Sequence, residues 1–227
     1  MPDAGDGAGR AGPGCGPDCA CSANEFGEAE ARRSLRSYRG SGAPKTTKWL
    51  IDGLTEGGVE GMTVLDIGAG VGAVYLELLA SGATTATDID RSPALVAVAR
   101  EEAARRGVAD RVRFEVGDFV ALASETPPAD LVVLDRVVCC YSDMKSLVLL
   151  STARARRRYG LVYPRDALWI RAGYGLLNAI ERLARRKIRA HVHRTAAVDG
   201  LVRAAGFAPR LHRSNLFWQV VVYERAV

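Results

Sequence analysis

A short β-branched run leads directly into a glycine-rich turn, and this junction constrains the fold more than any other feature. Residues 64–72 read VLDIGAGVG. The apolar run predicts a strand over residues 63–67. Glycines after a buried strand let the turn backbone approach a ligand closely and leave its N–H groups open. The junction therefore predicts an α/β fold with a binding site at the end of this strand.

Strands and helices alternate after this turn. Further strands are predicted over residues 84–88, 112–116, 131–134 and 159–163, with helices over 74–80, 92–106 and 142–154 between them. Alternation of this kind indicates a doubly wound parallel sheet with helices on both faces.

The end of the chain departs from this alternation. Helices predicted over residues 168–186 and 195–205 are followed by strands over 208–213 and 216–224, joined by only two residues. So short a link requires an antiparallel hairpin. The predicted fold is an α/β, Rossmann-like doubly wound sheet of seven strands, mostly parallel, with a C-terminal antiparallel hairpin.

The chain of 227 residues is expected to hold one domain after a tail. Residues 1–22 are rich in Gly, Ala, Pro and Asp and are expected to be disordered. Residues 23–227 form the predicted domain, with N-terminal helices in 23–61 and the Rossmann-like core in 62–227. No apolar run reaches the roughly 18 residues of a membrane span, and no secretory signal is recognisable, so a cytoplasmic location is expected.

Charge is distributed unevenly along the chain. Residues 1–150 carry a net charge of −7, whereas residues 151–227 carry 16 basic and 4 acidic side chains, a net +12. This asymmetry is consistent with an anionic partner or with a solvated basic surface. The arginines at 182, 185, 186 and 189 are expected to form a solvated face, and nucleic-acid binding by them would weaken steeply with salt.

Acidic residues follow three of the predicted strands. Asp66 precedes the glycine turn, and Asp88 ends the next strand 22 positions later, where a carboxylate can accept hydrogen bonds from both hydroxyls of a ribose. After the third strand, Asp118 could accept from an exocyclic amine while Phe119 packs on a purine. Because all three positions lie at the carboxyl edge of the sheet, they indicate a ligand that contains a nucleoside.

These motifs resemble the class I S-adenosylmethionine-dependent methyltransferase family. The resemblance covers residues 46–227 and rests on VLDIGAGVG, ATDIDRSP, VRFEVGDF and ADLVVLDRVV. It implies S-adenosylmethionine as cofactor, with an acid near the methionine amino group, a glycine turn, a ribose ligand, adenine contacts and a segment beside the methionine and the acceptor. The residues implied are, in that order, Asp66; Gly68, Ala69, Gly70 and Gly72; Asp88 with Ile89; Asp118 and Phe119; and Asp135 with Arg136.

Other classes of protein fit the motifs less well or remain open. A nicotinamide-dependent dehydrogenase would show G-x-G-x-x-G, whereas the glycines here are spaced as Gly68-x-Gly70-x-Gly72. The Asn/Asp-Pro-Pro-Tyr motif of nucleic-acid amino-methyltransferases is missing after the fourth strand, which disfavours methylation of base nitrogens. An RNA methyltransferase that uses the basic C-terminal half and a non-catalytic, cofactor-binding regulator remain alternatives.

The acceptor is indicated by a narrower resemblance. The stretches RVVCCY, VYPRD, GLLNAIERL and WQVVVYER resemble bacterial proteins similar to magnesium-protoporphyrin IX O-methyltransferases. This implies O-methylation of a small, anionic or aromatic acceptor. A carboxylate acceptor is already nucleophilic, whereas a hydroxyl would gain from a base, for which Tyr141 and His193 are the principal candidates beside His191.

Five cysteines lie in two groups. Cys15, Cys19 and Cys21 fall in the tail, while Cys139 and Cys140 follow the fourth strand. The odd count argues against a disulfide framework, and the tail spacing matches none of the usual zinc or iron–sulfur patterns, so no metal is expected. The adjacent pair is expected either to line the acceptor pocket or to act as small buried side chains.

Overall fold

The structure is a computed structural model that describes residues 27–183 and 191–226, with the side chains of 181–183 left aside. The predicted tail with its three cysteines, and the basic residues at 185, 186 and 189, lie outside the described residues, as does the side chain of Arg182.

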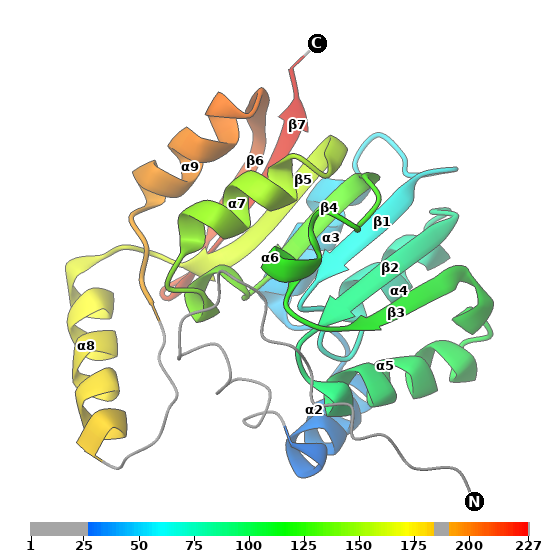
Figure 1. The fold of residues 1–227 in the computed structure, drawn as a ribbon, viewed down its shortest axis with the longest axis horizontal. Helices are drawn as coiled ribbons and strands as arrows, with labels where there is room; N and C mark the ends of the chain where they lie inside the picture. Colours follow the sequence, from blue (N-terminus) through cyan, green and yellow to red (C-terminus); the bar gives the residue numbers. More distant parts are fainter. Residues whose placement is uncertain (1–26, 184–190, 227) are drawn as a thin grey trace, which may run out of the picture.

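A single seven-stranded sheet confirms the predicted fold class (Figure 1). The strand order is β3-β2-β1-β4-β5-β7-β6, with parallel pairing among the first five strands and antiparallel pairing of β7 with both neighbours. The strands are β1 (Thr63–Ile67), β2 (Thr85–Asp90), β3 (Val112–Val116), β4 (Ala129–Asp135), β5 (Ala155–Pro164), β6 (Phe207–Ser214) and β7 (Trp218–Arg225).

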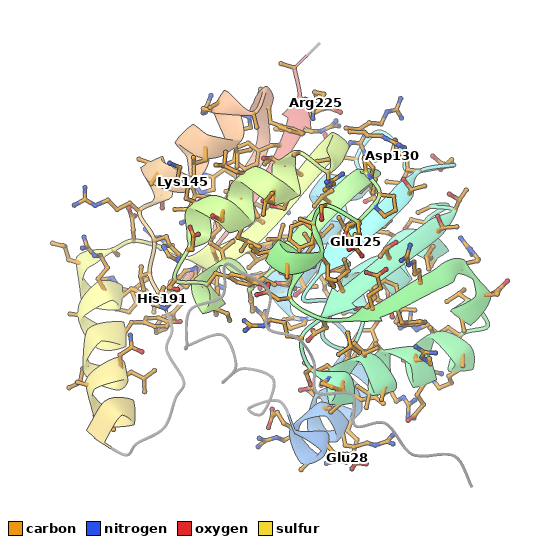
Figure 2. All side chains as sticks on the ribbon, in the orientation of Figure 1. Glu28, Glu125, Asp130, Lys145, His191 and Arg225 are labelled. Carbon is orange, nitrogen blue, oxygen red and sulfur yellow. The ribbon has the colours of Figure 1, made fainter. Side chains whose placement is uncertain are left out.

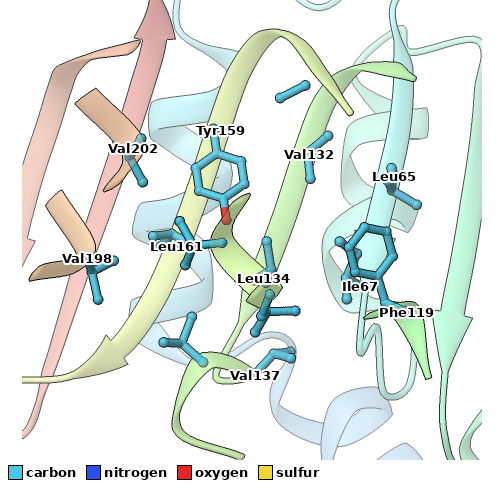
Figure 3. Packing of buried hydrophobic residues seen from close by; sticks show 14 of the residues in the cluster. Leu65, Ile67, Phe119, Val132, Leu134, Val137, Tyr159, Leu161, Val198 and Val202 are labelled. Atoms are coloured by element: carbon cyan, nitrogen blue, oxygen red, sulfur yellow. The ribbon is translucent and has the colours of Figure 1, made fainter. Parts of the chain in front are cut away.

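Alternate residues of the central strands face two separate helical layers, as the pleat of a strand requires. Val64 and Val133 pack with α3 (Lys45–Thr55) and α4 (Ala73–Ala80). Leu65 and Val132 pack on the other face with α6 (Phe119–Leu122), α7 (Met144–Thr152) and α9 (Thr195–Ala204), as Figure 3 shows for part of this core. Burial on both faces explains the continuous apolar run of β4.

Helix α2 (Glu28–Ser41) is held against α5 (Pro93–Arg105) by a buried acid. The fully buried Glu102 accepts hydrogen bonds from Arg39 at 2.8 Å and from Arg105 and Arg106. These guanidinium groups, Arg105 foremost, hold the pKa of Glu102 below its usual range. The N-terminal helix is therefore attached beside the strands that follow the glycine turn.

Two local features differ from the sequence-based expectation. The hairpin link spans residues 215–217, one residue longer than predicted, because the Asn215 side chain accepts from the backbone amides of Phe217 and Trp218 at 2.9 and 2.8 Å. Short 3-10 turns, η2 (Ala109–Arg111) and η3 (Val138–Cys140), precede β3 and follow β4.

Helix α8 (Leu168–Leu183) begins where predicted, shortly after β5, and stands at the periphery of the molecule (Figure 1). Within the described residues, none of the helices combines the length and apolar character that crossing a bilayer would require.

Candidate functional site

Carboxylates gather where the parallel strands end. Asp66 on β1 is in register with Asp88 on β2 and with Val133 on β4, so Asp135 lies two residues further along the same edge. Because these strands are adjacent and parallel, their carboxyl ends bring acids from distant parts of the chain together.

The backbone of the glycine turn is open at the ends of these strands. Gly70 has a φ of 62°, and a Cβ there would meet nothing within 4 Å. Gly72 has a φ of 81° and begins α4, and a Cβ there would collide with the phenol ring of Tyr75. The turn is fixed to β2 by a hydrogen bond of 2.7 Å from the Gly68 amide to the Ile89 carbonyl, and Ala69 closes it by accepting from the Gly72 amide at 2.9 Å. The turn thus exposes backbone, not side chain, to a ligand.

Asp66 and Asp135 keep unsatisfied oxygens at this edge. Asp66 is 1% exposed, and neither of its carboxylate oxygens has a partner within hydrogen-bonding distance and angle. Burial, followed by the charge of Asp135, raises the pKa of Asp66 to about 8, with a smaller opposing effect from the Tyr75 amide. One oxygen of Asp135 accepts from the Thr47 hydroxyl at 2.6 Å, whereas the other is buried without a hydrogen bond. Unpaired buried carboxylates are costly, so these oxygens suit a cationic or hydrogen-donating ligand group.

Asp88 and Asp90 point to the same face of β2 but differ in access. Asp88 is fully buried, both of its oxygens lack partners, and burial raises its pKa well above the usual value. Asp90 ends the strand, and its carboxylate accepts from the amides of Gly70 at 3.1 Å and Ser92 at 2.9 Å. The structure therefore places Asp90, not Asp88, against the glycine turn.

The two predicted adenine contacts, Phe119 and Asp118, differ in whether their side chains face the core or the polar side of the strand ends. Phe119 is 1% exposed, and its ring packs in the core near Leu65 and Ile67 (Figure 3), so the ring itself is not available for stacking. Asp118 caps α6 through the Val120 amide and also accepts from the Tyr141 hydroxyl at 2.6 Å. The Arg91 guanidinium lies over the Tyr141 ring, 5.5 Å from its centre. A polar wall formed by Asp118, Tyr141 and Arg91 thus follows the second and third strands.

Arg136 is held in an unusual conformation at the end of β4. Within the described part of the chain, it is the one non-glycine residue with a left-handed φ, 64°. Its guanidinium donates to the Thr46 hydroxyl at 2.9 Å and lies over the Trp218 ring at 5.3 Å. Backbone strain of this kind persists where surrounding contacts enforce it and is concentrated at functional sites. The structure thereby sets a cation directly after the acid Asp135.

The two candidate bases differ in their surroundings. The Tyr141 hydroxyl donates a hydrogen bond to Asp118. Burial, followed by the charge of Asp118, raises the pKa of Tyr141. The Nε2 atom of His193 lies 2.9 Å from the Tyr141 carbonyl, which can only accept, so Nε2 carries the proton. Burial is the largest effect on His193 and lowers its pKa, so the ring is neutral at neutral pH.

Cys139 and His191 complete this side of the site. His191 stacks on His193, and its amide donates to the Cys139 carbonyl at 2.7 Å (Figure 2 labels His191). The Cys139 thiol is buried and donates to the Arg136 carbonyl at 3.3 Å, whereas Cys140 is exposed. The buried cysteine thus serves packing, and the exposed one borders the surface near α8.

Four site residues were missed in the sequence: Asp90, Arg91, Thr46 and Thr47. Asp90 could have been found because it is the last acid before the Ser92-Pro93 helix start, which makes it the acid nearest the strand end. Thr46 and Thr47 carry no sequence signal for this role, since only the packing of α3 against the sheet brings them to Asp135 and Arg136.

The fold is that of the class I S-adenosylmethionine-dependent methyltransferases. Residues 59–165, just under half of the chain, match the family described as a methyltransferase domain. This match contains the glycine turn and β1 to β5.

Solved methyltransferase structures share this fold. Magnesium protoporphyrin IX methyltransferase (ChlM) from Synechocystis PCC 6803 with bound SAH superposes with a TM-score of 0.73 and 21% identity, covering 92% of this chain and 100% of that chain. An O-methyltransferase family protein from Burkholderia thailandensis gives a TM-score of 0.68 at 15% identity, covering 92% of this chain and 62% of that one. At these identities the likeness establishes the fold.

Curated relatives match over a shorter stretch. The ribosomal protein L11 methyltransferase of Pasteurella multocida (strain Pm70) is 34% identical over 92 residues, 40% of this chain and 29% of its own length. The release factor glutamine methyltransferase of Cereibacter sphaeroides is 37% identical over 86 residues, 37% of this chain and 30% of its own. The chain thus spans less than a third of each of these relatives.

Proposed function

We propose that this chain binds S-adenosylmethionine at the glycine turn and transfers its methyl group to an oxygen of a small, anionic or aromatic acceptor. The observation that carries the proposal is the group of buried carboxylates with unsatisfied oxygens at the strand ends, next to the open backbone at Gly70. Such a group of acceptors suits a ligand that offers hydrogen-bond donors and a positive charge.

The residues present fit this cofactor group by group. Asp90 at the end of β2 would accept from the ribose hydroxyls. Asp66 would accept from the methionine ammonium together with Asp135 Oδ1, which lies 3.8 Å from Arg136 Nε. Asp118 and the wall formed with Tyr141 would face the adenine. The ribose is assigned here to Asp90 and not to Asp88, because Asp90 accepts from the Gly70 amide of the glycine turn.

The chain's own contribution to the reaction would be positioning. When bound, the cofactor supplies a methyl group already activated by a sulfonium, so holding the acceptor in line accounts for most of the catalysis required. Arg136, with the strand-end position described above, would pair with an acidic acceptor. His193 is a candidate base for a hydroxyl acceptor, while the hydrogen bond from Tyr141 to Asp118 favours a positioning role for Tyr141.

Relatives support the transfer but not one acceptor. The curated protein methyltransferases align over at most 40% of the chain, whereas the solved methyltransferase structures resemble it over most of its length. The second resemblance favours a small acceptor over a protein or RNA, and the net charge of +12 in residues 151–227 suits an acceptor that is anionic.

Two measurements test the proposal. Calorimetric titration should show binding of S-adenosylmethionine and S-adenosylhomocysteine, and binding of NAD alone would refute it. Isotope-labelled S-adenosylmethionine should then label a porphyrin or phenolic acid in a screen that also contains RNA and ribosomal protein. Transfer only to the macromolecules would refute the choice of acceptor while leaving the cofactor assignment intact.

A further inference from the structure

Exposed apolar side chains are concentrated on one small part of the surface. Of the nine large hydrophobic residues that the described part of the chain exposes, seven lie on α8 or on the turn between β6 and β7. We call this set the α8 patch; it consists of Leu168, Trp169, Leu176, Leu177, Ile180, Leu216 and Phe217. A concentration of this kind on a folded protein marks a surface that meets a partner.

The two halves of the α8 patch are in contact. The rings of Trp169 on α8 and Phe217 on the hairpin turn meet edge to face, with their centres 5.0 Å apart. Leu168 and Leu176 are 81% and 65% exposed, and Leu216 is 65% exposed. Helix and hairpin thus present one continuous apolar surface.

Helix α8 is attached to the body by the opposite stripe. Ile170 is 1% exposed, while Tyr174 and Asn178, four and eight residues on, are half-buried. The helix also contains Gly173 and Gly175, which weaken a helix in water. A helix that packs through one narrow stripe gains stability when its apolar face is covered.

Charge indicates what covers this face. Arg171 on the helix and Arg165 at its start are exposed, and the Arg165 guanidinium donates to the Asn215 carbonyl at 3.1 Å, beside the hairpin turn. Residues 151–227, which contain the α8 patch, carry a net charge of +12. A second copy of the chain would bring like charges together, whereas an anionic bilayer attracts them.

We propose that the α8 patch docks on the surface of a membrane that contains anionic lipids. Apolar aromatic and aliphatic side chains beside arginines are the features of a helix that lies in the bilayer interface without crossing it. Because α8 follows the carboxyl end of β5, docking would turn the edge that carries the glycine turn towards the bilayer (Figure 1). The inference does not rest on methyl transfer, and its test does not measure it.

Vesicle flotation of the full chain tests the proposal. Binding should be strong to vesicles of phosphatidylcholine with phosphatidylglycerol, weak to phosphatidylcholine alone, and reduced by salt. The variant Leu176→Asp/Ile180→Asp should lower the partition coefficient at least about tenfold. The matched control is Leu149→Asp, because Leu149 is an exposed leucine on α7 outside the patch, 42% accessible. Thermal unfolding followed by circular dichroism should show that all variants fold.

A second measurement avoids disruptive substitutions. Brominated acyl chains should quench the fluorescence of the bound wild type, and Trp169→Phe should remove most of that quenching while Trp49 and Trp218 remain. Equal vesicle binding by the aspartate variant would overturn the proposal. A dimer in light scattering that the aspartate variant dissociates, without vesicle binding by the wild type, would also overturn it. Binding to RNA that is tighter than binding to vesicles, and equal in the wild type and the aspartate variant, would do the same.

Discussion

The carboxylate of Asp90 accepts a hydrogen bond from the backbone amide of Gly70 at 3.1 Å, which joins the end of β2 to the most open point of the glycine turn. The same carboxylate caps the start of α5 through the Ser92 amide. A side chain held by two backbone donors is rigid, and this acid is therefore preorganised for a ligand that enters the turn.

Substitutions of Asp90 and of Asp88 should differ in their effect on cofactor affinity. Asp90→Ala should weaken S-adenosylhomocysteine about tenfold to a hundredfold, because ribose hydrogen bonds to a charged group are lost. Asp88→Asn should leave the affinity nearly unchanged, because the fully buried side chain keeps its size and loses only a charge that burial disfavours. Calorimetry measures both, with the exposed Asp110→Asn as control. The reverse order of effects would restore Asp88 as the ribose ligand.

A pair of glycines separates ligand contact from backbone strain. Gly70 and Gly107 have φ values of 62° and 71°, and at both a Cβ would meet open space. Alanine at either position should therefore cost about 1 kcal/mol of unfolding free energy through strain alone. Only Gly70→Ala should also weaken the binding of S-adenosylhomocysteine, because the added methyl group of the alanine would occupy the open space beside the glycine turn. Equal affinities in the two variants would place the ligand elsewhere.

Local patterns in the sequence were sufficient for the sheet but not for the details of the site. Strands such as β1 and β4 are predicted by their apolar runs, and the short hairpin link requires β6 and β7 to be antiparallel. In contrast, both Asp88 and Asp90 follow the strand pattern, and only the exact end of β2 shows that Asp90 is the one bonded to the glycine turn.

The contacts of Phe119 and Thr47 illustrate a second limit. Phe119 follows a motif that suggests stacking, yet the short helix α6 turns its ring into the core. Thr47 reaches Asp135 across 88 positions of sequence, because α3 packs on the sheet. Contacts between distant segments depend on packing, which the local sequence does not encode.

Tyr141 should behave as a positioning residue and not as a base. Its hydroxyl already donates to Asp118, so Tyr141→Phe should release that acid and weaken S-adenosylhomocysteine about fivefold. The matched control is Tyr223→Phe, which removes a hydrogen bond of 3.1 Å to Asp199 on α9, away from the glycine turn, and should leave affinity unchanged. A residue that acts only as a base would show no change in calorimetry, and that outcome would return Tyr141 to the candidate bases.

Asp66 should couple cofactor binding and stability to pH. Its pKa is about 8 in the folded protein and 3.8 when unperturbed, so between these values the folded state holds a proton that the unfolded state has lost. The free energy of unfolding should therefore fall as pH rises through this window, by up to about 1.4 kcal/mol per unit from this group. Asp66→Asn should abolish that contribution, so its stability advantage over the wild type should grow from acid pH to pH about 8.

Binding should show the same coupling with a different readout. The methionine ammonium requires an ionised Asp66, so S-adenosylhomocysteine should release protons from the wild type at neutral pH, and its affinity should rise as pH approaches about 8. Calorimetry in buffers of different ionisation enthalpy measures this release. 5′-Methylthioadenosine lacks the amino-acid group and should release fewer protons, which provides a matched ligand. Equal proton release by the wild type and by Asp66→Asn would show that another group accepts the ammonium, and Asp135, whose pKa is also raised by burial, would then be the acid to test.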